Sequence, residues 1–285
     1  MNFNYSVPQK WYENVYRDKK QPCSAARSFS LLHPEKTQEC WLLLHGYRGY
    51  PGELVRPAQD LFESGFDVFV PRIPGHGTSR KDFIASRGKD WLTFCDNALS
   101  DLCGKYGTVN ILGHSMGSSV AAVIGAGREK VGKIIYVSPS FENAQMPLPA
   151  RIILKALSPF TPHVPCKWHP SSKYHQHYEN APCDELYLGD QYWRFYFTKQ
   201  LGDYYKIMKR ALQCVKRQPH KHLVIVPQLD KIISAPSVKL YQNAVAYEQN
   251  VVYIPNATHN VFYDKDPAAE EAAVQAVLKF ALEKE

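Results

Sequence analysis

Gly113-His114-Ser115-Met116-Gly117 is the stretch that decides how this chain is expected to fold. It follows the apolar run 109–112 and precedes the small-residue run 118–127, so it predicts a strand, a tight turn and a helix with Ser115 at the apex. A turn this sharp leaves no room for side chains two positions before and after the serine, which accounts for glycine at both. The turn lifts the Ser115 hydroxyl clear of the sheet and places the Met116 amide at a helix N-terminus, where an oxyanion would form.

Further strands and helices alternate on both sides of this turn. Apolar runs predict strands at 40–44, 67–71, 109–112, 133–137, 222–227 and 250–255, and helical patterns cover 54–64, 91–104, 237–248 and 267–282. Strands that alternate with helices imply right-handed crossovers and a mostly parallel sheet. The predicted class is therefore α/β, with helices flanking the sheet and the functional site beyond the carboxyl ends of the strands.

The alternation stops after Ser138 and returns at residue 218. Eight prolines lie between 139 and 182, eight aromatic residues lie between Tyr187 and Tyr205, and no strand pattern is present. We expect residues 139–217 to form an inserted, mainly helical cap, and residues 1–138 and 218–285 to form the α/β core. The aromatic residues either pack against the core or line an acyl pocket, in which case Tyr192, Trp193 and Tyr196 are the candidate substrate contacts.

Composition predicts a globular protein without a membrane span. Hydrophobic residues make up 45% of the chain, yet no run of about 18 uncharged apolar residues occurs and the N-terminus lacks the features of a signal peptide. We expect a soluble, cytoplasmic protein with no nucleic-acid partner. The net charge of +7 is concentrated between 141 and 217, where 11 Lys or Arg face 6 Asp or Glu. This excess is either a solvated surface or a source of weak attraction to anionic interfaces.

Cysteine and histidine spacing argues against a metal or disulfide framework. The seven cysteines include no C-x-x-C pair, and an odd number cannot form a complete set of disulfides. His175 and His177 lie near Cys166, His169 and Cys183, but the spacing matches no zinc pattern. We expect reduced cysteines, no metal and no organic cofactor.

An acid and a base for Ser115 are found by their positions after predicted strands. A serine hydroxyl needs a base to accept its proton, and an imidazole serves best when a carboxylate fixes its tautomer. Asp230 follows the strand 222–227 by three residues, and His259 follows the strand 250–255 by four. Because the carboxyl ends of parallel strands share one edge of a sheet, these residues are expected to meet Ser115 there, in the order nucleophile, acid, base.

Other titratable residues near strand ends give alternatives. Glu142 follows the strand 133–137 closely enough to be the acid in place of Asp230. His45 and His114 flank glycines in predicted loops, where structural hydrogen bonding is the expected duty.

Together these stretches resemble the α/β-hydrolase superfamily, and within it the branch of monoacylglycerol lipases, bacterial carboxylesterases and serine aminopeptidases. The resemblance rests on Leu43-Leu44-His45-Gly46-Tyr47, Pro74-Gly75-His76-Gly77-Thr78-Ser79, Gly113 to Gly117, the Asp230 loop and His259, and spans 39–282 except for the cap. It implies an α/β-hydrolase fold and a second oxyanion donor on the Tyr47 backbone N–H. The chain departs from the family pattern around the acid, with Pro227-Gln228-Leu229 before it and Lys231 after it.

The predicted function is that of a serine hydrolase which cleaves small carboxylic esters, with an acyl chain on the substrate and an acyl-enzyme on Ser115. One alternative is amide cleavage as in the serine aminopeptidases, in which a cap carboxylate would recognise an amine. Another is a ligand-binding protein on a hydrolase fold that turns its ligand over slowly. The sequence leaves the oligomeric state open.

Overall fold

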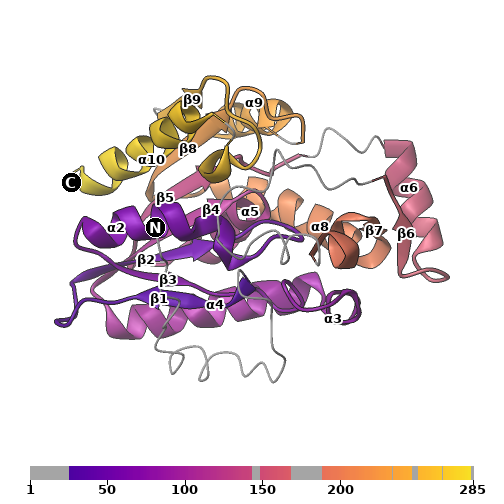
Figure 1. The fold of residues 1–285 in the computed structure, drawn as a ribbon, viewed down its shortest axis with the longest axis horizontal. Coiled ribbons are helices and arrows are strands. Elements are labelled where there is room, and N and C mark those ends of the chain that lie inside the picture. Colours follow the sequence, from indigo (N-terminus) through magenta and orange to yellow (C-terminus); the bar gives the residue numbers. More distant parts are fainter. Residues whose placement is uncertain are drawn as a thin grey trace.

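A seven-stranded sheet forms the centre of the protein (Figure 1). The computed structural model describes residues 26–142, 148–167, 188–232, 234–245, 250–264 and 266–283. The strand order is β1-β3-β2-β4-β5-β8-β9, and only β1 runs antiparallel to its neighbour. The strands are β1 (Phe29–Leu31), β2 (Glu39–Leu44), β3 (Asp67–Val70), β4 (Thr108–His114), β5 (Val131–Val137), β8 (Lys221–Pro227) and β9 (Asn250–Ile254). The prediction of a mostly parallel sheet is confirmed.

Helices cover both faces of the sheet. One hydrophobic cluster contains α2 (Val55–Glu63) and α10 (Pro267–Leu282), and the other contains α4 (Gly88–Lys105), α5 (Met116–Gly125) and α8 (Thr198–Val215). Strand β2 is apolar from Cys40 onward because both of its faces are buried: Leu42 and Leu44 join one cluster while Trp41 and Leu43 join the other. Helix α9 (Ser234–Ala244) packs near β8 and α8.

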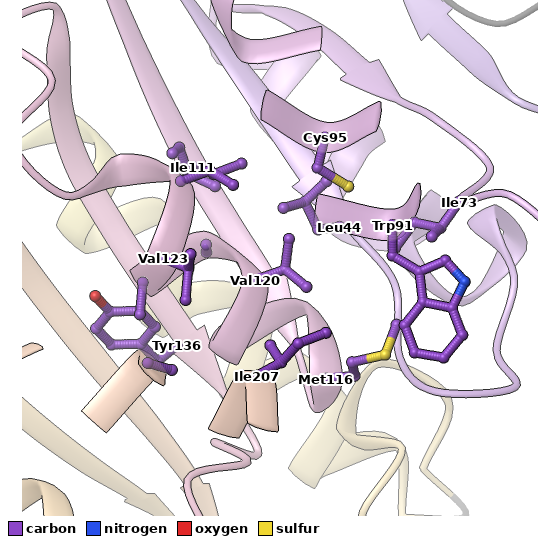
Figure 2. Packing of buried hydrophobic residues seen from close by; sticks show 14 of the residues in the cluster. Leu44, Ile73, Trp91, Cys95, Ile111, Met116, Val120, Val123, Tyr136 and Ile207 are labelled. Carbon is purple, nitrogen blue, oxygen red and sulfur yellow. The ribbon is translucent and has the colours of Figure 1, made fainter. Parts of the chain in front are cut away.

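Helix α5 lies in the middle of the larger cluster. All ten of its residues are buried, which explains its small side chains. Figure 2 shows Met116 and Val120 of this helix among Trp91 of α4 and Ile207 of α8. Each fully buried large apolar side chain contributes roughly 1.5–3 kcal/mol to the free energy of unfolding. This packing holds the N-terminus of α5, and with it Ser115, in place.

The segment between β5 and β8 contains strands that the sequence did not predict. After α6 (Leu148–Leu157), β6 (His163–Pro165) pairs antiparallel with β7 (Phe195–Phe197) in a separate small sheet. The expectation of no strand in 139–217 is wrong, because three-residue strands are too short to show a two-residue period. A π-helical turn, η3 (Gly189–Trp193), leads into β7.

Helix α8 packs as part of the main cluster rather than apart from it. Leu201, Tyr204 and Ile207 are buried there, and α8 contacts α5 along much of its length. In Figure 1, α6 and β6 lie to the right, away from the large sheet, whereas α8 runs back toward it. The division into core and cap stays a prediction, and we propose that the cap ends near residue 197.

Three short elements complete the described part. They are η2 (Pro51–Leu54), α3 (Arg80–Ala85) and η4 (Val261–Tyr263). The Ser79 hydroxyl caps α3 by accepting from the Asp82 N–H at 3.2 Å. None of the helices that the structure describes combines the length and apolar character needed to cross a membrane.

Candidate active site

Ser115 lies at a strained turn between β4 and α5. Its backbone has φ 54° and ψ −116°, a left-handed conformation that is rare for a residue with a side chain. A Cβ added to Gly113 would lie 2.2 Å from the Gly117 carbonyl oxygen, and one added to Gly117 would lie 2.0 Å from the Leu44 carbonyl oxygen. The Ser118 hydroxyl donates to the Gly113 carbonyl at 2.6 Å and fastens the turn. Glycine at both positions is therefore a steric requirement.

The structure brings Ser115, His259 and Asp230 together. His259 Nε2 lies 3.0 Å from Ser115 Oγ, and His259 Nδ1 donates to Asp230 Oδ2 at 2.8 Å. The Asp230 side chain has no exposed surface, and its Oδ1 also accepts from the Ile232 N–H at 2.7 Å. A carboxylate, an imidazole and a hydroxyl thus form one line of hydrogen bonds. Such a line fixes the imidazole tautomer with Nε2 free to accept the serine proton.

The acid loop reaches His259 despite its departures from the family pattern. The Gln228 N–H donates to the Ile254 carbonyl at 3.1 Å, and the Leu229 N–H donates to the Ala257 carbonyl at 2.8 Å. These bonds tie the turn after β8 to the loop after β9. The departures at Pro227 and Lys231 therefore leave the Asp230 carboxylate within reach of the imidazole.

Glu142, the alternative acid, lies elsewhere. Its carboxylate pairs with the Arg151 guanidinium, and its backbone exchanges hydrogen bonds with the Ser237 hydroxyl. The carboxylate hydrogen-bonded to His259 Nδ1 is that of Asp230.

The backbone segments that carry the two predicted oxyanion donors adjoin Ser115. Met116 is the first residue of α5, so its amide is among those that a helix N-terminus leaves without an intrahelical acceptor. A Cβ built on Gly46 would lie 3.3 Å from Ser115 Cβ, which sets the loop carrying Tyr47 against the serine. The Tyr47 ring stacks on the Tyr204 ring, with centroids 5.0 Å apart. The oxyanion role of both amides stays a prediction.

A family model described as Serine aminopeptidase, S33, matches residues 35–266, most of the chain. The chain belongs to the serine aminopeptidase S33 family. It is therefore a member of the α/β-hydrolase superfamily, in the branch that the sequence resembles.

One curated relative is similar to part of this chain. A thermostable monoacylglycerol lipase from Bacillus sp. (strain H-257) is 27% identical over 109 residues, which cover 38% of this chain and 42% of the relative. The match thus spans less than half of that relative's length.

Solved structures of low sequence identity share the fold. One chain from the structural work on LipS and LipT, two metagenome-derived lipolytic enzymes, gives a TM-score of 0.74 at 20% identity, over 91% of this chain and 98% of that one. The monoacylglycerol lipase of Paleococcus ferrophilus gives 0.67 at 17% identity, over 89% and 99%. Est1E of Butyrivibrio proteoclasticus with ferulic acid bound gives 0.61 at 19% identity, over 90% and 94%. The α/β-hydrolase fold is confirmed.

In this S33 protein, the segment 189–195 is fastened to the loops around the site. The Arg48 guanidinium donates to the carbonyls of Phe195 at 2.8 Å and Tyr192 at 3.3 Å, and the Trp193 indole N–H donates to the Arg48 carbonyl at 3.2 Å. The Tyr192 hydroxyl accepts from the Thr78 N–H at 2.8 Å and donates to the Gly75 carbonyl at 3.1 Å.

These contacts bear on the three candidate substrate residues. The Tyr192 ring is fully buried in the main cluster, which favours packing over substrate contact. Trp193 is partly buried beside the same cluster, and Tyr196 on β7 is 40% exposed. Substrate contact by Trp193 and Tyr196 stays a prediction, and Tyr187 lies outside the described residues.

Tyr204 and Glu53 are site neighbours that the sequence did not single out. The Tyr204 hydroxyl hydrogen-bonds to Ser140 Oγ, and its ring stacks on Tyr47. Leu201, Tyr204 and Met208 lie at helical spacing on one buried face of α8. This spacing is the sequence signal that could have distinguished Tyr204 from the other aromatic residues. Glu53 lies beside His114, sixty-one residues along the chain, and no local pattern could have paired them.

His45 makes structural hydrogen bonds. Its Nδ1 donates to the Gly46 carbonyl at 3.0 Å, and its Nε2 accepts from the Ile73 N–H at 3.0 Å. Complete burial lowers its pKa to about 4, so the ring is neutral. Of the residues weighed for a metal site, Cys166 lies with its Sγ 3.1 Å from the Trp193 carbonyl oxygen. His169, His175, His177 and Cys183 fall outside the described residues.

Proposed function

We propose that this S33-family protein hydrolyses small carboxylic esters through an acyl-enzyme on Ser115. The observation that carries the proposal is the line of hydrogen bonds from Asp230 through His259 to Ser115 Oγ. A serine hydroxyl becomes a strong nucleophile when a base accepts its proton, and here the base lies 3.0 Å away. The lipases and esterases that share the fold support the same reaction class.

Acylation follows from this geometry. Ser115 Oγ attacks the ester carbonyl carbon while His259 Nε2 accepts the hydroxyl proton. Asp230 holds the imidazole and stabilises the imidazolium that forms. The Met116 and Tyr47 amides stabilise the oxyanion of the tetrahedral intermediate. The imidazolium then returns the proton to the leaving alcohol, and the ester C–O bond breaks.

Deacylation uses the same groups. Water gives a proton to His259 Nε2 and attacks the acyl carbon. The intermediate collapses, Ser115 Oγ takes the proton back, and a carboxylic acid leaves.

The proposal is tested by steady-state hydrolysis of p-nitrophenyl butyrate. Wild type should complete many cycles per enzyme, and Ser115→Ala should lower kcat on the order of 10⁴-fold or more while circular dichroism stays unchanged. A folded wild type that releases one product molecule per chain and then stops would favour the slow ligand-binding alternative. No hydrolysis of any ester would refute the proposal.

Amide cleavage is the second candidate, because the matching family model is described as a serine aminopeptidase. Recognition of a substrate amine needs an available carboxylate. The carboxylates that the structure describes between residues 139 and 217 pair with arginines, as Glu142–Arg151, Asp190–Arg194 and Asp203–Arg87. Ester hydrolysis is therefore ranked first, and aminoacyl-anilide turnover comparable to ester turnover would reverse the ranking.

The substrate proposal is an ester with an acyl chain. Each methylene buried in an acyl pocket adds up to roughly 0.8 kcal/mol, which is about a fourfold rise in kcat/KM. A series of p-nitrophenyl esters should therefore climb from acetate to butyrate or octanoate. A kcat/KM that stays flat or falls along the series would contradict the acyl pocket but not the role of Ser115 as nucleophile.

A further inference from the structure

A second histidine–carboxylate pair lies behind the nucleophile, and the reaction cycle above uses neither member. His114 Nδ1 lies 3.5 Å from Glu53 Oε2, and the two side chains are only 4% and 12% exposed. His114 is the last residue of β4, directly before Ser115, and Glu53 belongs to η2.

The pair contacts three of the loops that form the site. His114 Nε2 donates to the His259 carbonyl oxygen at 3.0 Å, and the Gly46 N–H donates to Glu53 Oε2 at 3.4 Å. A Cβ built on Gly46 would lie 3.6 Å from His114 Nδ1 and 3.7 Å from Glu53 Oε2, so the loop sits directly on the pair. One ion pair thus joins the loop of the nucleophile, the loop of the base and the loop that carries Tyr47.

The contacts of His114 favour a proton on both of its ring nitrogens. Nδ1 faces a carboxylate and Nε2 faces a carbonyl oxygen, and only an imidazolium donates from both. Burial alone would lower the pKa of His114, but the hydrogen bond and charge of Glu53 outweigh it and raise that pKa, with a smaller contribution from Asp230. The same pairing lowers the pKa of Glu53 against its burial.

The two other histidines near the pair, His45 and His259, are not ion-paired with Glu53. His45 also faces Glu53, but its Nε2 accepts from the Ile73 N–H and the ring is neutral. The His259 ring, 5.2 Å from the His114 ring, has its Nδ1 on Asp230. The carboxylate of Glu53 therefore serves His114, and that of Asp230 serves His259.

We propose that His114 and Glu53 are positioning residues that hold the His259 and Gly46–Tyr47 loops against Ser115. The His259 carbonyl oxygen receives two donors, His114 Nε2–H and the Ser138 hydroxyl at 2.8 Å, so both of its lone pairs are used. Fixing this carbonyl sets the imidazole 3.0 Å from Ser115 Oγ. Apolar groups often replace a buried ion pair without loss of stability, so a contribution to stability is a weak explanation for this pair. Its contacts to three site loops are better explained by a role in positioning those loops.

The test compares Glu53→Gln with a matched control. Glutamine cannot keep His114 doubly protonated, so the neutral ring donates to only one of its two partners. The control is Asp67→Asn, which removes the carboxylate of another pair, with His33 Nδ1 at 3.1 Å and Asp67 only 2% exposed, at the opposite end of the strands. Both variants are assayed with p-nitrophenyl butyrate for kcat and KM, and their folding is checked by urea denaturation.

We expect Glu53→Gln to lower kcat about 10- to 100-fold with KM changed by less than about threefold, because misplacing a reacting group by an ångström costs up to about 10² in rate. Asp67→Asn should keep kcat within about twofold even where stability falls. Nitrogen-15 NMR of the histidine side chains should show that the pKa of His114 lies above 6.5 in wild type and falls in Glu53→Gln. If the variant does not fold, the NMR measurement on wild type still tests whether His114 is charged.

Equal kcat in Glu53→Gln and wild type, an equal loss in Asp67→Asn, or a His114 pKa at or below 6.5 in wild type would overturn the inference. Its kinetic part rests on the proposed function. A wild type without ester turnover would refute that function, and the positioning role with it, while NMR would still report the charge of the pair.

Discussion

At the scale of the residue, the 2.8 Å hydrogen bond between Asp230 Oδ2 and His259 Nδ1 selects the imidazole tautomer. Asp230→Asn should fold normally but lower kcat on the order of 10⁴-fold, because an amide also stabilises the wrong tautomer. Glu142→Gln, which removes the partner of Arg151, should keep kcat within about twofold. Ester hydrolysis and circular dichroism of both variants check this. If Glu142→Gln is the inactive one, the acid has been assigned wrongly.

Buried neutral histidines should make stability fall in acid. Burial lowers the pKa of His45 from 6.5 to about 4, and that of His76 well below 6.5. Below pH 6.5 the unfolded chain then binds more protons than the folded one, so this stability is present above pH 6.5 and is lost as the pH falls toward 4. For His45 the loss at pH 4.5 is on the order of 2–3 kcal/mol.

Urea unfolding of wild type and His45→Gln at pH 7 and pH 4.5 measures that loss. The variant should be less stable at pH 7, yet lose on the order of 2–3 kcal/mol less between the two pH values. An identical acid loss in both proteins would mean that His45 is not buried and neutral.

At the scale of the element, the strand–turn–helix around Ser115 depends on two glycines. Gly113→Ala puts a Cβ 2.2 Å from the Gly117 carbonyl oxygen and should destabilise the protein by about 3 kcal/mol or more. The control is Gly104→Ala in α4, where a Cβ meets nothing within 4 Å and should stabilise by roughly 0.5–1 kcal/mol. Urea denaturation of both variants gives the two free energies of unfolding. Similar values for the two would contradict the steric account of the turn.

Helix α6 is the element that we expect to contact anionic interfaces. Its outward residues are unusually exposed for large apolar side chains, with Leu148 at 67%, Ile152 at 60% and Ile153 at 58%, and Phe160 follows at 87%. Residues 148–167 contain three Lys or Arg and no Asp or Glu. Apolar area flanked by positive charge is typical of helices that adsorb to anionic lipid surfaces.

Sedimentation with phosphatidylglycerol vesicles tests this. Wild type should pellet with these vesicles more than with phosphatidylcholine vesicles, and Ile152→Ser with Ile153→Ser should lower the bound fraction several-fold. Tyr253→Ser on β9, where the side chain is 47% exposed, is the control and should bind as wild type does. Equal binding of the double variant and wild type would mean that the excess of Lys and Arg is an ordinary solvated surface.

The elements that frame Ser115 were predictable because each has a strong local signal. Apolar runs precede Ser115, Asp230 and His259. Strands β4 and β8 are buried on both faces, as such runs predict, whereas β9 is a partly buried edge strand. The small sheet of β6 and β7 and the turn η3 are too short to show a period. The pair of Glu53 and His114 and the contact of Tyr204 with Ser140 are long-range, so only the folded chain reveals them.

At the scale of the whole molecule, the strand order explains how distant residues meet. Tyr47, Ser115, Asp230 and His259 follow β2, β4, β8 and β9, whose parallel course brings their carboxyl ends to one edge. Segment 189–195 is bonded to the loops at this edge, and α8 packs on α5 beneath it. The site is therefore built from four strand ends and a segment fastened across them.

The most direct test of the central claim, that Ser115 is the nucleophile, is mass spectrometry after treatment with an alkyl fluorophosphonate. Wild type should gain one adduct per chain, and peptide mapping should place it on Ser115. Asp230→Asn should acquire it far more slowly, and Ser115→Ala should acquire none, because only a serine activated by the imidazole displaces fluoride readily. A folded wild type that gains no adduct, or a Ser115→Ala variant that is still modified at the wild-type rate, would contradict the account.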